Sequence, residues 1–125
     1  MDITPLTRSD WQIINGYGNG GFTCRDERHE GSILVAPELV YPLPIQTLAD
    51  LTLEALTALQ THVPSIELLL VGCGSEIAPI DPELRRTVRD WGIVMEPMDT
   101  GAACRTYNVL LVEERRVAAA LVAVD

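Results

Sequence analysis

Lysine is absent from this sequence of 125 residues, so its nine basic residues are all arginines, against 18 Asp and Glu residues and a net charge of −9. Proteins bind a nucleic-acid backbone through clustered positive charge, which a few scattered arginines on an acidic chain do not supply. We therefore expect no nucleic-acid partner. Arginine without lysine is also typical of a GC-rich genome, and we expect a bacterial source.

Cysteine and histidine are scarce as well. The cysteines are Cys24, Cys73 and Cys104, and the histidines are His29 and His62. The cysteines are odd in number and include no Cys-x-x-Cys pair, so their spacing favours neither a disulfide framework nor a zinc site. We expect no metal and no cofactor.

Long apolar runs are missing too. The longest, Val117–Val124, is far shorter than the roughly 18 residues that cross a bilayer. Met1–Asp10 does not have a basic region followed by an apolar run, which is the pattern of a targeting peptide. We expect no membrane insertion and a cytoplasmic location.

Enough apolar material for a core is present, since 47% of the residues are apolar. A chain of this length buries roughly two thirds of the surface that its unfolded form exposes. We expect a single α/β domain over residues 1–125. Its β-rich N-terminal part covers about residues 10–45 and its α/β part about residues 46–124.

Glycine turns separate short strand-like runs in the first third of the chain. Trp11–Asn15 and Phe22–Arg25 flank four glycines, and Ser32–Ala36 is a short apolar run that ends at Pro37. This pattern predicts an antiparallel set of short strands.

Three prolines, Pro37, Pro42 and Pro44, then predict an extended crossing segment and no helix before about residue 47. Proline lacks an amide donor and keeps the preceding residue out of the helical region. The apolar spacing then becomes that of one helix, which Thr47 or Asp50 caps and Pro64 ends. Its apolar stripe consists of Leu48, Leu51, Ala55, Leu56, Leu59 and Val63.

A strand and a helix follow. Ile66–Val71 is a nearly continuous apolar run, typical of a parallel strand that is buried on both faces. Asp81, Pro82 and Gly92 supply the cap, the first-turn proline and the end of a helix over about residues 81–91.

The last part of the chain repeats this alternation. A short strand at Ile93–Met95 leads to a third helix that Asp99 or Thr100 caps, and Val117–Val124 is the last strand. One face of the third helix holds Ala103, Tyr107, Leu110 and Leu111. The order of elements predicts an α/β three-layer sandwich with a mixed sheet and about three helices, preceded by the β-rich section.

Two loops follow the carboxyl ends of predicted strands, where open α/β sheets bind ligands. Glycines in the turn at 72–76 allow close approach to backbone amides, and the helix start at 99–105 combines small residues with an arginine, which suits an anion. The candidate residues are Gly72, Cys73, Gly74, Ser75, Asp99, Thr100, Gly101, Cys104 and Arg105. The structural alternative is a plain exit turn, a helix cap, and an arginine paired with an internal carboxylate.

Cys104 lies where the helix dipole and Arg105 favour a thiolate, so the sequence allows a reactive thiol. The alternative is a buried cysteine that serves only in packing, because free cysteine is among the most buried residue types. Neither histidine lies on a segment placed near Cys104, which argues against a catalytic pair. Cys24 is expected in the core.

The run Met98–Asn108, followed by Val117–Val124, resembles an uncharacterised small-domain family that includes mitochondrial complex I assembly factor 3 and the adipogenesis-associated domain protein, and Asp99–Asn108 is the specific part. Other matching parts, in the same order, are Gly31-Ser32 leading to Pro37, Ile66–Gly74, and Glu83-Leu84-Arg85 with Trp91-Gly92. Cys73 replaces a frequent threonine of the family, and Pro97 replaces another apolar residue. The resemblance implies a three-layer α/β fold around a mixed sheet, no established enzymatic activity, and a role of mitochondrial members in complex I assembly.

Two functions therefore remain open. The first is a non-catalytic protein-binding or complex-assembly factor whose partner is another protein, with a surface patch that includes Trp11, Tyr17, Tyr41 or Leu43. The alternative is a small anionic-ligand binder or enzyme that uses the 72–76 turn and the 99–105 helix start. That alternative needs a pocket between the two loops.

Overall fold

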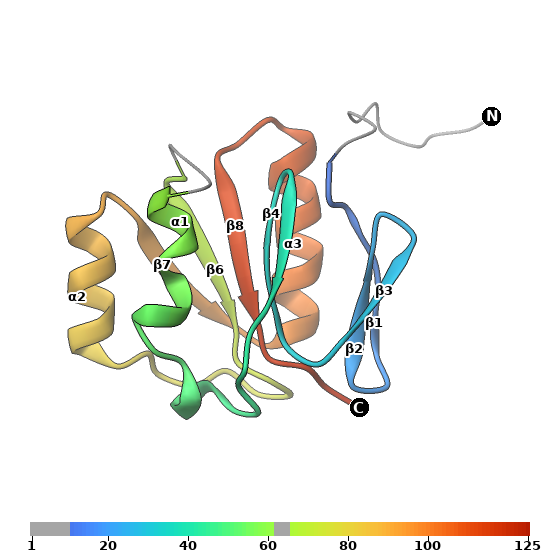
Figure 1. Ribbon diagram of the computed structural model, residues 1–125, viewed down its shortest axis with the longest axis horizontal. Helices are drawn as coiled ribbons and strands as arrows, with labels where there is room; N and C mark the ends of the chain where they lie inside the picture. The colour runs from blue at the N-terminus through green and yellow to red at the C-terminus, as the bar shows by residue number, and fades with distance from the viewer. Residues whose placement is uncertain (1–10, 62–65) are drawn as a thin grey trace.

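The computed structural model describes residues 11–61 and 66–125. Among these residues, a sheet of five strands in the order β5-β4-β8-β6-β7 forms the centre (Figure 1). The strands are β4 (Ile33–Ala36), β5 (Leu39–Pro42), β6 (Leu68–Gly72), β7 (Val94–Met98) and β8 (Val117–Leu121). β6 is parallel to β7 and β8, whereas β4 is antiparallel to β5 and β8. The predicted mixed sheet is confirmed.

A second, antiparallel sheet lies beside the central one. It consists of β1 (Ile14–Gly18), β2 (Gly21–Cys24) and β3 (Glu27–Glu30). The helical elements of the described residues are the 3-10 turns η1 (Leu48–Asp50) and η2 (Glu54–Leu56) and the helices α1 (Ala58–Thr61), α2 (Pro82–Asp90) and α3 (Thr100–Val112).

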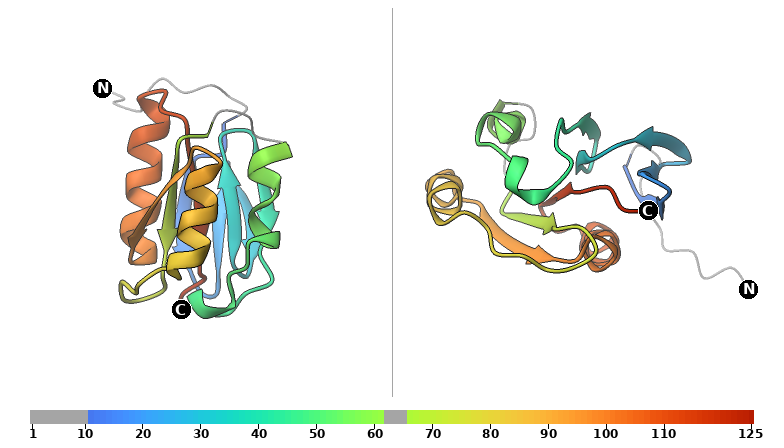
Figure 2. Two further views of the ribbon diagram at one scale, coloured as in Figure 1. Left: turned by 90° about the vertical axis from the view of Figure 1, so that its left-hand side faces the viewer. Right: turned by 90° about the horizontal axis from the view of Figure 1, so that it is seen from below.

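Three layers result, as predicted. α2 and the η1–α1 segment cover one face of the central sheet, and α3 together with the small sheet covers the other (Figure 2). Two clusters of buried residues reflect this division. The first joins Leu69 and Met95 to Leu56 and Val88, and the second joins Leu70 to Tyr107 and Phe22 of the opposite layer.

The continuous helix predicted from about residue 47 is wrong. The chain instead forms η1, η2 and α1 in succession. Local side-chain hydrogen bonds accompany the breaks: the Thr52 hydroxyl accepts from the amide of Ala55, and the Thr57 hydroxyl donates to the carbonyl of Glu54. Such bonds compete with regular helical pairing. Thr47 is the cap residue of η1, and Asp50 completes a capping box.

The expected burial of this segment is nevertheless correct. Leu51, Leu56 and Leu59 are buried, and Leu48 and Ala55 pack partly buried against the same cluster. The last stripe position, residue 63, and the predicted stop at residue 64 lie outside the described residues. The apolar stripe therefore identifies the side of the segment that packs on the sheet, although the segment is not one continuous helix.

The N-terminal third differs from its prediction in three places. Ser32–Ala36 contributes β4 to the central sheet instead of joining the strands that precede it. The proline-rich crossing segment contains β5, and Pro42 is tolerated there because β5 is an edge strand. Glu27–Glu30 is polar and forms β3 through its pairing with β2, so apolar alternation does not reveal it.

The later elements agree more closely with the prediction. Asp81 caps α2 and Pro82 is its first residue, while Gly92, which has a positive φ, follows the C-cap residue Trp91. β7 reaches Met98, beyond the predicted Met95, and β8 ends at Leu121. After Leu121 the chain leaves the sheet toward the small sheet, where the amide of Gly20 donates to the carbonyl of residue 124.

Candidate functional site

The two candidate loops lie side by side at the carboxyl ends of β6 and β7. The amide of Cys73 donates to the carbonyl of Met98 at 2.8 Å, and the amide of Thr100 donates to the carbonyl of Gly74 at 2.8 Å. Asp99 is the cap residue of α3, and its carboxylate accepts from the amide of Ala102 at 2.9 Å. The predicted cap is confirmed, and backbone hydrogen bonds join the two loops.

Thr100 joins three segments at this end of the sheet. Its hydroxyl accepts from the amide of Gly74 at 3.0 Å and donates to the carbonyl of Val122 at 2.7 Å, and the residue has no exposed surface. The hydroxyl thereby satisfies one partly buried and one buried backbone group. Thr100 connects the ends of β6 and β8 to the start of α3.

Gly72 has a packing role in this junction. A Cβ atom there would lie 2.9 Å from Cδ2 of Leu121 and 3.1 Å from Cα of Thr100. Glycine therefore allows β6, β8 and α3 to approach one another, and the space next to Gly72 is already filled. Ser75, the next polar candidate, is exposed.

Gly101 and Arg105 meet a residue of the small sheet. The guanidinium of Arg105 donates to the Tyr17 hydroxyl at 3.0 Å, and a Cβ atom on Gly101 would lie 2.6 Å from that hydroxyl. Arg105 is exposed, and among the described residues it forms no ion pair with a carboxylate. Within the described part of the chain, the partner of Arg105 is therefore a phenol instead of the predicted internal carboxylate.

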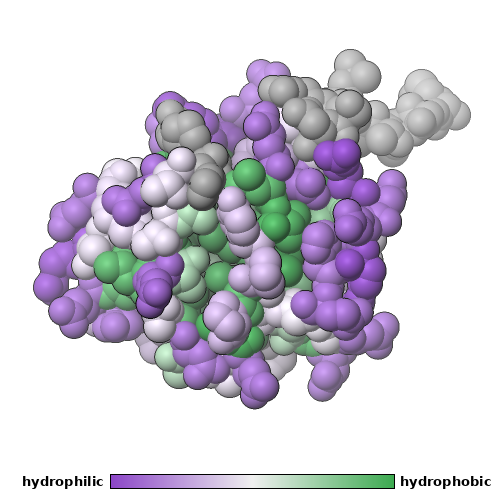
Figure 3. Space-filling model, in the orientation of Figure 1, coloured by the Kyte–Doolittle hydropathy of each residue, from purple (hydrophilic) through white to green (hydrophobic). Residues whose placement is uncertain are grey.

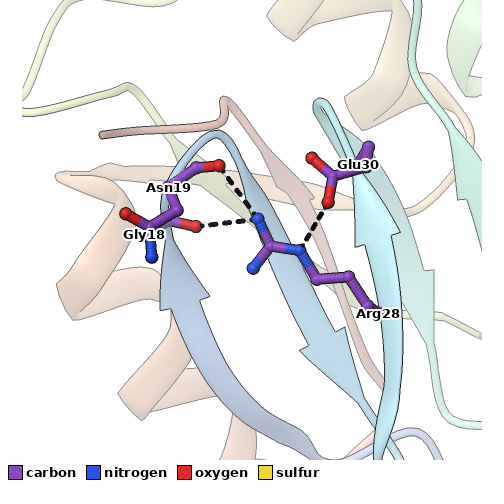
Figure 4. Close-up of polar contacts among 4 residues, drawn as sticks. All are labelled: Gly18, Asn19, Arg28 and Glu30. Carbon is purple, nitrogen blue, oxygen red and sulfur yellow. Dashed lines mark hydrogen bonds and ion pairs between the residues drawn. The ribbon is translucent and has the colours of Figure 1, made fainter.

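A clamp holds the turn next to Tyr17. The Arg28 guanidinium donates to the carbonyls of Gly18 and Asn19 at 3.1 and 3.0 Å and to the Glu30 carboxylate at 2.8 Å (Figure 4). This contact lowers the pKa of Glu30, first through the hydrogen bond and then through the charge of Arg28. The turn between β1 and β2 is thus tied to β3, which keeps Tyr17 beside α3.

Cys104 is not the reactive thiol that its place near a helix start suggested. It is buried, and burial raises the pKa of its thiol to about 12, reinforced by Cys24 and Asp99 and opposed by Arg105. Burial also raises the pKa of Cys24, to about 11. Loss of hydration outweighs the charge of an exposed arginine at this site. Both cysteines belong to the core, as expected for Cys24.

Asn108 makes a contact that sequence reasoning missed. Its side-chain amide donates to the carbonyl of Ile14 at 2.8 Å, and its side-chain oxygen accepts from the amide of Ile14 at 2.9 Å. The side chain thus pairs with both backbone groups of one residue, as a neighbouring strand does. An asparagine in the middle of a helix, where its propensity is low, is the signal that could have revealed this role.

The four residues proposed for a surface patch separate into two groups. Trp11 and Leu43 are buried in the core, whereas Tyr17 is 43% exposed and Tyr41 is half-buried. Val109 lies four residues after Arg105 on α3 and is 57% exposed, so the two side chains share a face of the helix. Tyr17, Arg105 and Val109 form an exposed set, which we call the α3 surface.

The described residues were compared with the requirements of a metal site and of a membrane-spanning helix. Within residues 11–61 and 66–125, no three His, Cys, Asp or Glu side chains gather closely enough to hold a metal ion. None of the helices in these ranges combines the length and the apolarity that a membrane crossing requires.

Comparison with known proteins places this architecture in a family. The sequence pattern of a family described as "Protein of unknown function (DUF498/DUF598)" matches residues 14–122. The chain belongs to the DUF498/DUF598 family. The match begins at β1 and ends just after β8, so it includes both sheets and the junction between them.

Some relatives in this family are named as assembly factors, and others are uncharacterized. A Xenopus tropicalis protein named NADH dehydrogenase (ubiquinone) 1 alpha subcomplex assembly factor 3 is 32% identical over 96% of this chain and 67% of its own length. An uncharacterized Rhodobacter capsulatus protein is 38% identical over 86% of this chain and 82% of its own length. The resemblance to the assembly-factor family is therefore confirmed.

A solved structure shares the fold. The crystal structure of a Bartonella henselae protein, described as an outer membrane protein, has a TM-score of 0.85 and 39% sequence identity, and the match covers 95% of this chain and all of that one. The three-layer mixed α/β architecture is thus also the architecture of an experimentally determined relative.

Proposed function

We propose that this chain is a non-catalytic protein-binding factor that assists the assembly of a respiratory NADH dehydrogenase complex. The observation that carries the proposal is the 32% identity, over 96% of the chain, to a relative named as an assembly factor of that complex. Identity along nearly the whole chain supports a shared surface as well as a shared fold. Fold alone does not determine function, so the proposal needs its own test.

The geometry of the α3 start favours this function over a small anionic ligand. The Asp99 carboxylate accepts from the amide of Ala102, and the Gly74 carbonyl accepts from the amide of Thr100. The Thr100 hydroxyl both accepts a hydrogen bond and donates one. A helix start binds an anion through amides that lack an internal partner. These groups serve instead as a joint between α3 and the strand ends.

We assign partner binding to the α3 surface. Tyrosine and arginine are enriched among the residues that dominate protein interfaces, and Tyr17 and Arg105 hold each other in place before a partner arrives. Val109 adds an exposed apolar side chain on the same helix face. Cytoplasmic action is part of the proposal, supported by three free cysteines, since reducing compartments keep thiols reduced.

Deletion and complementation in the source organism test the function. We expect deletion to lower the amount of assembled NADH dehydrogenase complex on native gels, and the parent gene to restore it. The Tyr17→Ser, Arg105→Ser double variant should restore it poorly, whereas Arg86→Ser, a matched control on exposed α2, should restore it fully. An unchanged amount of complex after deletion would contradict the proposal.

A further inference from the structure

A groove lies on the other side of the central sheet from α3, between η1 and the loop that leads into α2. Its volume is about 320 Å³, within the range of ligand pockets. Leu51, Ile80 and Leu84 are buried and form its floor, while Ala49 and Pro79 are exposed at its edge. η1 and this loop lie next to each other at the lower edge of the molecule (Figure 1).

The groove has a negatively charged rim. Asp81 lines it, and Asp50 directly follows Ala49 of the lining. Both carboxylates accept hydrogen bonds from backbone amides, Asp81 from Glu83 and Asp50 from Gln46 and Thr47. Those amides lower the pKa of Asp50, so its charge persists at neutral pH.

Positive charge is absent from the part of the sequence that builds the groove. Residues 29–84 contain no Lys or Arg and eight carboxylates: Glu30, Glu38, Asp50, Glu54, Glu67, Glu76, Asp81 and Glu83. Three of these, Asp50, Asp81 and Glu83, fall within residues 48–51 and 78–84, the two stretches that line the groove. The asymmetry favours a cationic partner over an anionic or neutral one.

The nearest arginines in the sequence do not neutralise the rim. The Arg85 guanidinium donates to the carbonyl of Met95 at 2.9 Å and is thereby held at the edge of β7. Arg86 is exposed two residues after Leu84, and residues two apart on a helix point to different sides. Leu84 faces the groove, so Arg86 points away from it.

An exposed apolar residue lies next to the groove lining in the sequence. Ile77 is 65% exposed and directly precedes the lining residue Ala78. On the face that carries η1 and α1, apolar residues gather at the centre, above the lower edge where the groove lies, and hydrophilic residues surround them (Figure 3). An apolar floor inside a charged rim is the arrangement of a peptide-binding groove, in which burial gives affinity and charge gives orientation.

We propose that this groove binds a basic amphipathic segment of a partner protein, whose apolar side chains enter the groove while its Arg or Lys side chains face the carboxylates of the rim. The inference rests on the proposed function only in that the partner is a protein. It assigns a second surface, separated from the α3 surface by the central sheet. One copy of the chain then contacts two protein segments at once.

Peptide binding to the purified chain tests this proposal. The probe is a short labelled peptide with Leu at positions i, i+3, i+4 and i+7 and Arg between them. One control peptide replaces Arg with Glu, and the other replaces Leu with Ser. Of the three peptides, we expect only the Leu/Arg peptide to shift the backbone amide resonances of residues 48–51 and of the non-proline residues of 77–84, with an affinity that falls as salt rises.

Two charge variants separate the groove from the net charge of the chain. Asp81→Asn with Glu76→Gln removes one rim charge and one exposed charge two residues before the lining residue Ala78. The variant keeps an acceptor at the cap of α2, because Asn caps helices as well as Asp. We expect about 3- to 10-fold weaker binding, from the strength of exposed ion pairs. The matched control, Glu96→Gln with Glu113→Gln, removes two exposed charges elsewhere and should bind as the parent does.

Any one of three results would contradict binding of the peptide in the groove. They are equal weakening of binding in both double variants, equal binding of the Glu peptide, and resonance shifts confined to the α3 surface. None of these results bears on the complementation experiment, which uses the α3 variants. Conversely, intact NADH dehydrogenase after gene deletion contradicts the proposed function and leaves peptide binding in the groove unaffected. The two proposals therefore fail separately.

Discussion

The two faces of the central sheet are held by different kinds of contact. On the α3 face, side chains bond to partners far away in the sequence: Thr100 to Val122, Arg105 to Tyr17, and Asn108 to Ile14. On the α2 face, the described part of the η1–α1 segment uses its side-chain hydrogen bonds within four residues, as Thr57 does with Glu54.

This difference shows what each kind of contact can specify. A hydrogen bond has a direction and a required partner, so the polar contacts of α3 allow one placement of the small sheet. Apolar burial is not directional, so the leucines of the η1–α1 segment can be buried by three short turns as well as by one helix. An open groove remains beside these turns.

The largest expected contrast between the faces is in thiol reactivity. At pH 8, pKa values of about 11 and 12 leave about a thousandth or less of the Cys24 and Cys104 thiols deprotonated, and both side chains are buried. Cys73, which packs partly buried against the other cluster, should react with a thiol reagent at least about 100-fold faster than either.

Spectroscopic thiol counting with time measures this contrast. In the unfolded protein all three thiols should react with the reagent at once. A Cys73→Ser variant of the native protein should lose the fast phase of the reaction. Rapid labelling of a second thiol in the native parent would mean that the α3 face opens easily, which contradicts the comparison.

Thr100→Val should cause the largest loss of stability. Valine keeps the shape of threonine but leaves the partly buried amide of Gly74 and the buried carbonyl of Val122 without the hydroxyl that they share. We expect the free energy of unfolding to fall by about 2 to 4 kcal/mol, from the cost of two orphaned groups. Denaturant titration measures it.

The same change on the other face is the control. Thr57 is exposed, and its hydroxyl donates to the carbonyl of Glu54, three residues earlier. Thr57→Val should change stability by no more than about 0.5 kcal/mol. Similar losses for Thr57→Val and Thr100→Val would remove the distinction between long-range and local contacts.

Asn108→Ala should cost less, because its contact with Ile14 is only partly buried. The variant loses two hydrogen bonds to one backbone unit, which corresponds to about 1 to 2 kcal/mol. Hydrogen exchange of the Ile14 amide should become faster at the same time. Unchanged exchange at Ile14 would show that other contacts hold β1 against α3.

Tyr107→Phe should act in the opposite direction. The Tyr107 hydroxyl is fully buried and has no hydrogen-bond partner among the described residues, and burial raises the pKa of this phenol. Removal of the hydroxyl should leave stability unchanged or raise it by up to about 1 kcal/mol. Thermal unfolding measures the change, and a clear loss would indicate an ordered water on the hydroxyl.

Arg105→Ala should have the smallest effect on stability. Its partner is the exposed Tyr17 hydroxyl, so the expected change is below about 0.5 kcal/mol, compared with Arg86→Ala as control. Melting with and without phosphate checks the ligand alternative. A phosphate-dependent rise in the melting temperature of the parent that Arg105→Ala abolishes would move the assignment to an anion site.

Elements with strong local signals could be predicted from the sequence. The Asp81-Pro82 start and Gly92 end mark α2, Asp99 marks the start of α3, and the apolar run before Gly72 marks β6. Caps, turns and buried strands depend on a few neighbouring residues, so they appear in the sequence itself. The proximity of the two loops follows from the parallel strands that they end.

The side-chain contacts between α3 and the small sheet could not be predicted from local sequence signals. Tyr17 and Arg105 are 88 residues apart, and Asn108 and Ile14 are 94 apart. Nothing near Arg105 indicates a phenol partner, and the sequence alone favoured a carboxylate. Cys104 shows the same limit, because its burial, which raises the thiol pKa, comes from β2 and α3 packing together.

The sequence by itself determined the acidic charge, the apolar stripes, the helix caps and the glycine positions, because these depend on residue type and spacing. Only the tertiary structure decided that β4 and β5 join the central sheet, that the η1–α1 stripe breaks into turns, and that the α3 start is a joint while a groove opens beside η1. The reason is physical. Local preferences act over a few residues, whereas pairing and packing select partners across the whole chain.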